Sequence, residues 1–412
     1  MTSRDITHFP TCTYVPSELS FTLAARPRYA SCHGPMMELM GKTAEELREY
    51  CLLLGEPAYR GGQIYRALYA EMNFDLSEMT NLPAALREKL ARQATLTLPR
   101  VKQRYVSADG SVRYLLGLGG GAKPAFVEAV YMPSERRQTV CISTQAGCAV
   151  DCQFCLTAQL GLIRNLTAGE ILGQVLLPLK EMSHKHPRSL EAPTIAVTDS
   201  DDNPGESGDP VQTNIVLMGQ GEPLLNFDHV LGALRILLDE KGVGLSPKRV
   251  TLSTSGIVPG IERLAREEVR PKLAISLNAS SDEQRDVLMP INRKYPLKVL
   301  IDTCRNYPLR TWEHITFEYV MLGGVNDSAE DAKRVAKLLA PLKSVKVNLI
   351  PWNPGELPYK ESSEARIESF QKMLIHRQIP TFVRYSRGRD VMAACGQLAL
   401  LEVKHSPLNV LQ

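Results

Sequence analysis

The chain has 412 residues, of which 44% are hydrophobic and 23% charged, with a formal net charge of +3 and a pI near 8.3. This length exceeds that of one typical domain and predicts a large catalytic domain with a smaller appendage. No run of eighteen apolar residues occurs, so no segment is predicted to span a membrane. The modest net charge restricts nucleic-acid binding to local basic surfaces.

The cysteine content indicates the compartment. Nine cysteines are spread over the chain, an odd number that is unlike the disulfide framework of a small secreted protein. We therefore expect free thiols and a cytoplasmic location.

Residues 1–35 contain four prolines, little periodicity and no signal-peptide pattern. We predict a disordered N-terminal extension. The excess of arginine in this segment leaves a transit peptide as an alternative. The adjacent Met36 and Met37 suggest a third possibility, in which translation begins at this pair.

Residues 36–97 are predicted to form a small helical, RNA-binding accessory domain. Thr43 and Glu46 have the spacing of a capping box at the start of a helix, and Gly55 ends that helix. Two more helices are expected over residues 60–70 and 82–93. Basic and aromatic side chains suit RNA phosphates and bases. A packed face with solvated charges is the alternative for the same residues, Arg60, Tyr65, Arg66 and Tyr69.

Residues 98–137 are predicted to form a hairpin and the strands that lead into the large domain. An alternating pattern over residues 101–116 surrounds Asp109-Gly110, which is a strong hairpin turn signal. Further strands are expected over residues 126–132 and 139–143. The second of these leads directly into a cysteine-rich loop.

Cys148, Cys152 and Cys155 of this loop form a Cys-x3-Cys-x2-Cys pattern. A common zinc site uses two Cys-x2-Cys pairs, and this pattern contains only one such pair. Three thiolates on a short loop instead suit one 4Fe-4S cluster in which one iron has no protein ligand. A zinc site and three buried structural cysteines are the alternatives.

Residues 138–398 are predicted to form a partial (β/α)6 barrel. Short apolar stretches alternate with amphipathic ones, which predicts a parallel sheet with helices outside it. An insertion rich in Asp, Pro and Ser interrupts the pattern over residues 184–212, and residues 399–412 form a C-terminal tail. Strands are expected over residues 214–218, 250–253, 272–277, 315–321, 345–350 and 381–385.

Glycine and polar residues follow these strands, where the loops of a parallel β/α fold converge. Glycine permits close approach of the backbone, and the Glu222 carboxylate suits the ammonium group of a bound amino acid. Each residue alone fits a turn or a helix cap equally well. Together they predict a cofactor pocket formed by Gly221, Glu222, Ser253, Ser276, Leu277, Asn278 and Asn353.

Cys395 precedes Gly396 and follows a basic segment that contains Arg384, Arg387 and Arg389. Nearby positive charge would lower the pKa of its thiol and increase its reactivity as a nucleophile. A buried apolar role is the alternative for this cysteine.

The cysteine triplet resembles that of the radical S-adenosylmethionine (SAM) enzymes, and nine ordered blocks over residues 43–398 resemble the RlmN family. The blocks are EAVY at 128–131, Cys141 seven residues before the triplet, TAQ at 157–159, GEPLLN at 221–226, STSG at 253–256, PIN at 290–292, EYVML at 318–322, NLIPWNP at 348–354 and ACGQL at 394–398.

This resemblance implies a radical SAM barrel and methylation of carbon 2 of an adenosine in 23S rRNA and in the tRNA anticodon loop. The cysteine triplet would hold one 4Fe-4S cluster, whose open iron would bind SAM within the pocket predicted above. Cys395 would receive a methyl group from one SAM, and a second SAM would generate the radical that activates it. Cys141 would release the product through a transient disulfide with Cys395, and Glu128 would be the proton acceptor.

The resemblance also implies 23S rRNA, tRNA and a flavodoxin-like or ferredoxin-like electron donor as partners of a monomer. A Cfr-like enzyme that methylates carbon 8 uses the same cysteines and is the nearest alternative. A non-methylating iron-sulfur protein that binds RNA or transfers electrons is an alternative of another class. Asn278 and Leu156 stand where many members have His and Ser. Four cysteines, Cys12, Cys32, Cys51 and Cys304, are left as apolar fillers.

Overall fold

The computed structural model describes residues 36–119, 124–185 and 211–399. Apart from Met36, these residues belong to one compact unit, Met37–Gln412. The extension predicted over residues 1–35, most of the predicted insertion and nearly all of the predicted tail lie outside the described residues. The ends of the predicted insertion are regular structure, because helix α5 (Ala168–Lys185) continues to residue 185 and strand β9 begins at residue 212.

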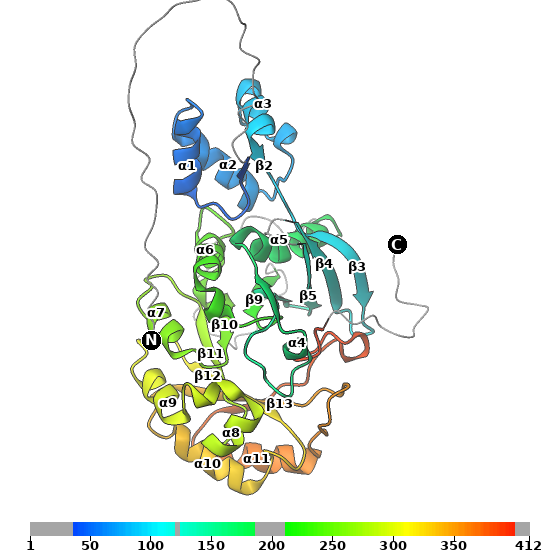
Figure 1. Cartoon of the computed structure of the whole chain (residues 1–412), viewed down its shortest axis with the longest axis vertical. Helices are drawn as coiled ribbons and strands as arrows, with labels where there is room; N and C mark the ends of the chain where they lie inside the picture. Colours follow the sequence, from blue (N-terminus) through cyan, green and yellow to red (C-terminus); the bar gives the residue numbers. More distant parts are fainter. Residues whose placement is uncertain (1–35, 120–123, 186–210, 400–412) are drawn as a thin grey trace, which may run out of the picture. The chain divides into compact units, whose positions relative to one another are not determined.

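One ten-stranded sheet, in the order β14-β13-β12-β11-β10-β9-β6-β5-β4-β3, dominates the described residues (Figure 1). Neighbouring strands run parallel from β6 to β14 and antiparallel from β3 to β6. Because β3 and β14 are free edges, the sheet is open, which confirms the predicted partial barrel. The strands are β3 (Arg100–Val106), β4 (Val112–Leu118), β5 (Ala125–Pro133), β6 (Arg137–Cys141), β9 (Gln212–Leu217), β10 (Val250–Thr254), β11 (Lys272–Ser276), β12 (Ile315–Met321), β13 (Val345–Pro351) and β14 (Thr381–Val383).

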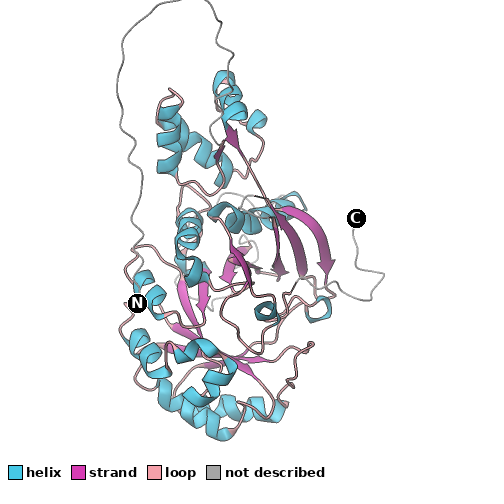
Figure 2. Cartoon of the chain, viewed as in Figure 1, coloured by secondary structure: helices cyan, strands magenta, loops and turns pink. Residues whose placement is uncertain are grey.

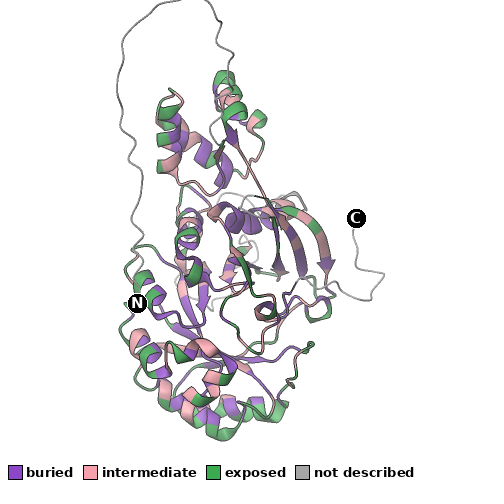
Figure 3. Ribbon diagram, in the orientation of Figure 1, coloured by how far each residue is buried: buried purple, intermediate pink, exposed green. Residues whose placement is uncertain are grey.

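Side chains alternate between the two faces of the parallel strands, as the two-residue period of a strand requires. Phe317 and Val347 are fully buried on the face that packs against helices, and the neighbouring Glu318 and Asn348 point to the other face. Figure 3 shows that the strands of the sheet are largely buried. Helices connect successive strands (Figure 2). They are α5, α6 (Phe227–Leu238), α7 (Val258–Leu264), α8 (Asp282–Leu288), α9 (Leu297–Arg305), α10 (Ala329–Leu339) and α11 (Glu364–His376). None of the helices in the described ranges is long and apolar enough to cross a membrane.

The N-terminal helices are α1 (Ala44–Leu53), α2 (Tyr59–Tyr69) and α3 (Ala84–Gln93). The predicted capping box is confirmed: the Glu46 N–H donates to the Thr43 hydroxyl at 3.3 Å, and the Thr43 N–H donates to the Glu46 carboxylate at 2.8 Å. A two-stranded parallel sheet of β1 (Met37–Glu38) and β2 (Ala94–Thr95) joins the ends of this region. That sheet was not predicted.

For Tyr65 and Tyr69 the structure supports the alternative of a packed face over contact with RNA. Both rings are buried, at 2% and 0% exposure, and they pack edge to face with centroids 4.9 Å apart. The Tyr65 hydroxyl donates to Asp239 at 2.8 Å, and the Tyr69 hydroxyl donates to the carbonyl of Lys42 at 3.1 Å. The exposed ring of this helix is Tyr59, which was not predicted. A helical period on its own does not tell which aromatic residues face the core.

The predicted hairpin is confirmed as β3 and β4, which pair with Val106 opposite Val112. Gly110 adopts a φ of 81° in the turn, a conformation that glycine reaches without strain. The Asp109 carboxylate accepts a hydrogen bond from the Ser111 N–H at 2.8 Å. The same carboxylate accepts a bond from the Gly388 N–H at 3.0 Å, so the turn also anchors the C-terminal segment.

Two adjacent glycines of α2 provide a matched test of helix packing. A Cβ on Gly61 would lie 2.3 Å from the backbone nitrogen of Arg48 in α1, whereas a Cβ on Gly62 would meet no atom within 4 Å. We expect Gly61→Ala to lower the free energy of unfolding by about 1–3 kcal/mol, because α1 and α2 must separate. Gly62→Ala should raise it by up to about 1 kcal/mol, since alanine favours the helix. Urea unfolding measures both, and equal effects would contradict this packing.

Candidate active site

The cysteine-rich loop begins after β6 and lies between the short antiparallel strands β7 (Gln145–Gly147) and β8 (Leu162–Asn165), which were not predicted. Gly147 has a φ of 72°, and a Cβ at this position would lie 1.8 Å from the Gly161 carbonyl oxygen. The same oxygen accepts a hydrogen bond from the Cys148 N–H at 3.0 Å. Glycine is therefore required at position 147, and this contact fixes the first cysteine of the triplet.

Cys148, Cys152 and Cys155 are free thiols that line one cavity. Burial, with smaller contributions from the charges of Glu222 and Cys155, raises the pKa of Cys148 to about 12. Burial and the other two thiols place the pKa of Cys152 well above its usual value. Thiols in this setting keep their protons at neutral pH, and binding of a metal centre displaces those protons.

The arrangement of these thiols fits an iron-sulfur cluster. The three side chains come from one short loop and line the same cavity. A 4Fe-4S cube takes each thiolate on a different iron, so thiols spaced around a cavity suit it.

Gly221 and Glu222 follow β9 and also line the cavity. Gly221 has a φ of 97°, and a Cβ there would lie 2.7 Å from the backbone nitrogen of Gln145. The Glu222 carboxylate accepts hydrogen bonds from the N–H and the hydroxyl of Ser255, both at 2.7 Å, and from the Leu224 N–H at 3.1 Å. Burial raises the pKa of Glu222, and the bonds from Ser255 oppose this effect. Glu222 thus joins the loop after β9 to the loop after β10.

Ser253 and Ser276, at the ends of β10 and β11, also line the cavity, with their hydroxyl oxygens 3.4 Å apart. Leu277, in contrast, is fully buried and is absent from the cavity wall. The loop after β11 therefore presents alternate residues to the cavity.

Asn278 lines the cavity, but its side chain mainly supports the wall. Its backbone has a φ of 54°, which asparagine tolerates better than most residues. Its amide oxygen accepts a hydrogen bond from the Val320 N–H at 2.8 Å, and its amide nitrogen lies 3.4 Å from the Met289 sulfur. The Asn278 carbonyl accepts a bond from the Asn326 side chain at 2.8 Å. These contacts hold the loop after β11 against β12.

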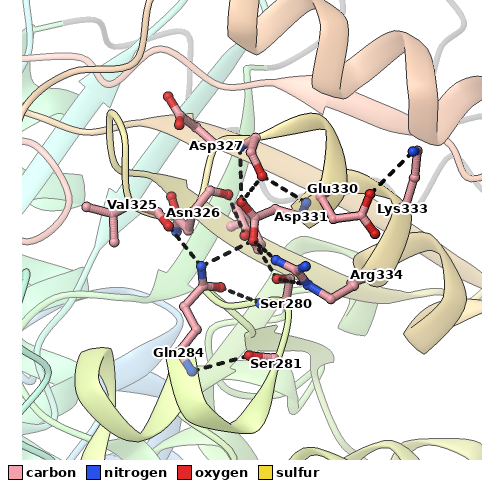
Figure 4. Close-up of polar contacts among 12 residues, drawn as sticks. Ser280, Ser281, Gln284, Val325, Asn326, Asp327, Glu330, Asp331, Lys333 and Arg334 are labelled. Carbon is pink, nitrogen blue, oxygen red and sulfur yellow. Dashed lines mark hydrogen bonds and ion pairs between the residues drawn. The ribbon is translucent and has the colours of Figure 1, made fainter.

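A polar network continues behind Asn278 (Figure 4). The Ser280 hydroxyl donates to the Asp331 carboxylate at 2.6 Å, and the Gln284 side chain donates to the same oxygen at 3.2 Å. Asp331 also forms the capping box of α10 with Ser328. The network therefore joins the loop after β11 to the start of α10 and restricts movement of the cavity wall.

Arg285 is fully buried and was not predicted. Its guanidinium donates to the carbonyls of Ser255, Ser276 and Leu277 at 2.7, 3.1 and 3.1 Å. Burial lowers its pKa to about 10, so it remains charged at neutral pH. It thereby joins the ends of β10 and β11 beneath the cavity. The sequence signal for this role was weak, because a single arginine on a short amphipathic helix usually faces solvent.

The segment that carries Cys395 lies against the cysteine-rich loop. The Leu156 N–H donates to the Gly396 carbonyl at 2.8 Å, and the Gln397 side chain donates to the Pro354 carbonyl at 2.7 Å. The Asn353 side chain donates to the Cys395 carbonyl at 3.2 Å. Asn353 thus touches this segment and is absent from the cavity wall, whereas Cys395 is part of that wall.

The prediction that nearby arginines lower the pKa of Cys395 is wrong. Cys395 is exposed to the cavity that it lines. Desolvation of its thiol by the surrounding protein raises its pKa to about 12, and the charges of Glu318 and Cys155 contribute less. Arg387 instead pairs with Asp109 at 3.3 Å and Arg389 with Glu361 at 3.1 Å. These carboxylates take up the positive charge that was expected to act on the thiol.

Cys141, the last residue of β6, is buried in a small apolar cluster with Val391, Ala393 and Leu398 of the C-terminal segment. Burial raises the pKa of its thiol, and the charge of Cys395 adds to this effect. The fold therefore packs Cys141 against the segment that carries Cys395, although the two cysteines are far apart in the sequence.

Glu128 lies in β5, 1% exposed, and its carboxylate forms an ion pair of 2.7 Å with Arg113. The Arg113 guanidinium also lies 4.2 Å from the centroid of the Tyr105 ring. Glu128 is absent from the cavity wall, so the structure separates it from the residues predicted to hold the cofactors.

A larger groove, of about 770 Å³, lies near the amino ends of β12 to β14. None of the predicted site residues lines it, and several of its side chains are basic, among them Lys337, Lys343 and Arg377. Size alone therefore does not identify the active site.

The fold and the cavity define a radical SAM enzyme, and the comparisons agree. The family model of the radical SAM superfamily matches residues 206–339, and the model of the ribosomal RNA large subunit methyltransferase N-terminal domain matches residues 37–96. A crystal structure of a radical SAM methyltransferase from Sphaerobacter thermophilus is 41% identical, with a TM-score of 0.78, and covers 88% of this chain and 99% of that one. The protein is a radical SAM methyltransferase.

Comparison with curated proteins identifies the family within the radical SAM methyltransferases. The chain is 46% identical to a probable dual-specificity RNA methyltransferase RlmN of Koribacter versatilis, over 85% of this chain and 98% of that protein. It is 43% identical to the dual-specificity RNA methyltransferase RlmN of Cereibacter sphaeroides, over 90% of this chain and 91% of that protein. The chain belongs to the RlmN family, which confirms the resemblance seen in the sequence.

The role of Arg285 can be tested by unfolding. We expect Arg285→Ala to lower the free energy of unfolding by at least about 3 kcal/mol, because three buried carbonyls lose charged hydrogen bonds. Arg235→Ala is the control, since that side chain is 58% exposed and pairs with Glu267 at the surface; its cost should stay below about 1 kcal/mol. Urea unfolding measures both variants. Similar losses of unfolding free energy would argue against a structural role for the buried hydrogen bonds of Arg285.

The raised pKa of Cys395 predicts low reactivity at neutral pH. In protein purified without a cluster, alkylation of Cys395 by iodoacetamide should be slow at pH 7 and should still accelerate above pH 10, because only the thiolate reacts and the pKa is about 12. Mass spectrometry of the peptide measures the rate, with the urea-unfolded chain as control. A rate that levels off below pH 8.5 in the folded protein would contradict the raised pKa.

Proposed function

We propose that this protein methylates carbon 2 of an adenosine in 23S rRNA and of an adenosine in the tRNA anticodon loop, through a methylated Cys395 and with two SAM molecules per turnover. The single observation that carries this proposal is that the C-terminal Cys395 and the cysteine-rich loop come together at one cavity. Cys395 lines the same cavity as the three thiols of the cysteine-rich loop, and Cys141 packs against the C-terminal segment that carries Cys395.

Each part of the cavity has a proposed role toward the cofactors. Cys148, Cys152 and Cys155 hold one 4Fe-4S cluster. SAM occupies the cavity above the strand ends, with contacts from Gly221, Glu222, Ser253, Ser276 and Asn278, which line it. The predicted contacts of Leu277 and Asn353 are not part of this proposal, because both residues lie outside the cavity wall. The hydrogen bonds of Asn278 to Val320 and Met289 favour a contact through its backbone rather than its side chain. When bound, the cluster and SAM supply the methyl group and the radical chemistry.

The chemical reason for two reactive cysteines lies in the substrate. Carbon 2 of adenine lies between two ring nitrogens and is too poor in electrons to displace a methyl group directly. A carbon radical on the sulfur of Cys395 adds to such a ring. Cys141 then attacks the sulfur of Cys395: an S–S bond forms as the S–C bond breaks, and the released carbon takes the proton of the Cys141 thiol to complete the methyl group. The one electron left over would return to the cluster. Glu128 takes the ring proton, which requires its ion pair with Arg113 to open or to relay the proton.

The substrate RNA is proposed to contact the helical region of residues 36–97. Tyr59 is 58% exposed, and the Arg60 guanidinium lies 4.8 Å from the centroid of its ring, an arrangement suited to stacking on a base beside a phosphate. A flavodoxin-like or ferredoxin-like protein supplies electrons. We propose that the enzyme is a monomer in the cytoplasm.

The position of methylation is tested with RNA from a strain that lacks the gene and from the complemented strain. We expect the complemented strain to regain 2-methyladenosine in both 23S rRNA and tRNA, detected by mass spectrometry after separation of the isomers. Recovery of the 8-methyl isomer alone would show a Cfr-like enzyme. Recovery of neither isomer would favour an iron-sulfur protein without methyl transfer.

The roles of the cysteines predict different failures of three variants. Cys148→Ala and Cys395→Ala should each abolish the modification, the first through loss of the cluster and the second through loss of the methyl carrier. Cys141→Ala should accumulate protein covalently joined to RNA, because release is blocked. Cys304→Ala is the control and should retain the modification, because this buried cysteine is absent from the cavity wall. Intact modification in Cys395→Ala, or no adduct in Cys141→Ala, would contradict the mechanism.

A further inference from the structure

Glu318 lies in β12 on the face of the sheet that forms the cavity floor. It pairs with Ser276 of β11 and with Asn348 of β13, and paired residues of parallel strands point to the same face. Glu318 lines the cavity together with Ser253, Ser276 and Cys395. The sequence places it in the EYVML block, but nothing in that pattern assigns it a role.

The carboxylate of Glu318 is held at a fixed position near both reactive thiols. Ser253 and Asn348 hydrogen-bond to it, and the positive charge of Arg384 acts on it from beyond Asn348. Its negative charge in turn acts on the thiols of Cys395 and Cys141. The titratable and charged groups that face Glu318 are therefore Arg384, Cys395 and Cys141.

Methylation of Cys395 needs a proton acceptor, because a cysteine thiol is mostly protonated at neutral pH and loses its proton when its sulfur is alkylated. The carboxylates of the cavity wall are those of Glu222 and Glu318. Glu222 already accepts three hydrogen bonds, from Ser255 and Leu224. Glu128 is paired with Arg113 and lies outside the cavity wall. Glu318 is the carboxylate whose charge reaches the thiol of Cys395.

We propose that Glu318 accepts the thiol proton of Cys395 when that cysteine is methylated, a step that rests on the proposed function. The S–H electron pair of Cys395 forms the new S–CH3 bond. The electron pair of the breaking S–CH3 bond of SAM stays on its sulfur, which gives S-adenosylhomocysteine. The proton moves to Glu318 and afterwards to water, and no group is oxidised or reduced.

The acidity of Glu318 suits this role. Burial raises the pKa of its carboxyl group to about 7, although Asn348, Ser253 and Arg384 oppose the effect. A proton acceptor is most effective when its pKa lies near the working pH. The raised pKa also means that the carboxylate loses its proton readily between turnovers.

The experiment follows methylation of Cys395 alone. Reconstituted protein with an unmethylated Cys395 is mixed with SAM without RNA, and the mass of the Cys395 peptide is measured over time. We expect Glu318→Gln to slow the gain of the methyl mass by about 100-fold or more. Glu368→Gln, an exposed carboxylate on α11, is the control and should match the parent. Binding of SAM, followed by its effect on the electron paramagnetic resonance of the cluster, should change less than threefold in both variants.

The sign of the effect separates two roles of Glu318. If its charge acted only by repelling the thiolate, its removal would favour the thiolate, and methylation would be as fast or faster in Glu318→Gln. That result overturns the inference. A parent protein that never gains the methyl mass would instead overturn the proposed function itself.

A second measurement uses only the parent protein and does not depend on the folding of a variant. The rate of Cys395 methylation should rise with pH and level off above a midpoint near 7, because the ionised Glu318 is the active form. A rate that is flat from pH 6 to 9, or one that still rises tenfold per pH unit at pH 9, would contradict Glu318 as the acceptor.

Discussion

The docking of the C-terminal segment on the cysteine-rich loop is the constraint on which the site depends. The hydrogen bond from the Leu156 N–H to the Gly396 carbonyl and that from Gln397 to the Pro354 carbonyl hold the segment in place. At its other end, the Asp109 carboxylate binds the Gly388 N–H. Cys395 thereby reaches the cavity that is lined by the three thiols of the cysteine-rich loop. Without this docking, the proposed cluster ligands and the proposed methyl carrier would not share one cavity.

The cavity floor is rigid because its buried polar groups bond to one another. Arg285 joins the ends of β10 and β11, Asn326 joins the loop after β11 to β12, and Glu222 joins the loops after β9 and β10. Buried polar groups that are fully paired restrict a site to one arrangement, since any shift would leave a donor or acceptor without a partner. Catalysis by radicals benefits from such a floor, because a reactive carbon must meet only its intended neighbour.

The placement of carboxylates divides the chemistry between two regions. Glu128 and Arg113 form a buried pair under the antiparallel strands, whereas Glu318 faces the cavity from the parallel strands. Glu128 forms an ion pair with Arg113, whereas burial raises the pKa of Glu318 and makes it a weaker acid. The same residue type is thus proposed to serve different steps, and the difference comes from the neighbours that the fold supplies.

The sequence by itself determined the fold class, the capping box of Thr43 and Glu46, the hairpin at Asp109 and the cysteine triplet, because periodicity and spacing are local properties. Only the tertiary structure decided that Tyr65 and Tyr69 are core residues, that Arg387 and Arg389 pair with Asp109 and Glu361 and do not activate Cys395, and that Glu318 faces that thiol. These outcomes depend on contacts between segments far apart in the chain. The charge of a side chain is visible in the sequence, but the partner that neutralises it is fixed only when the strands and loops assemble.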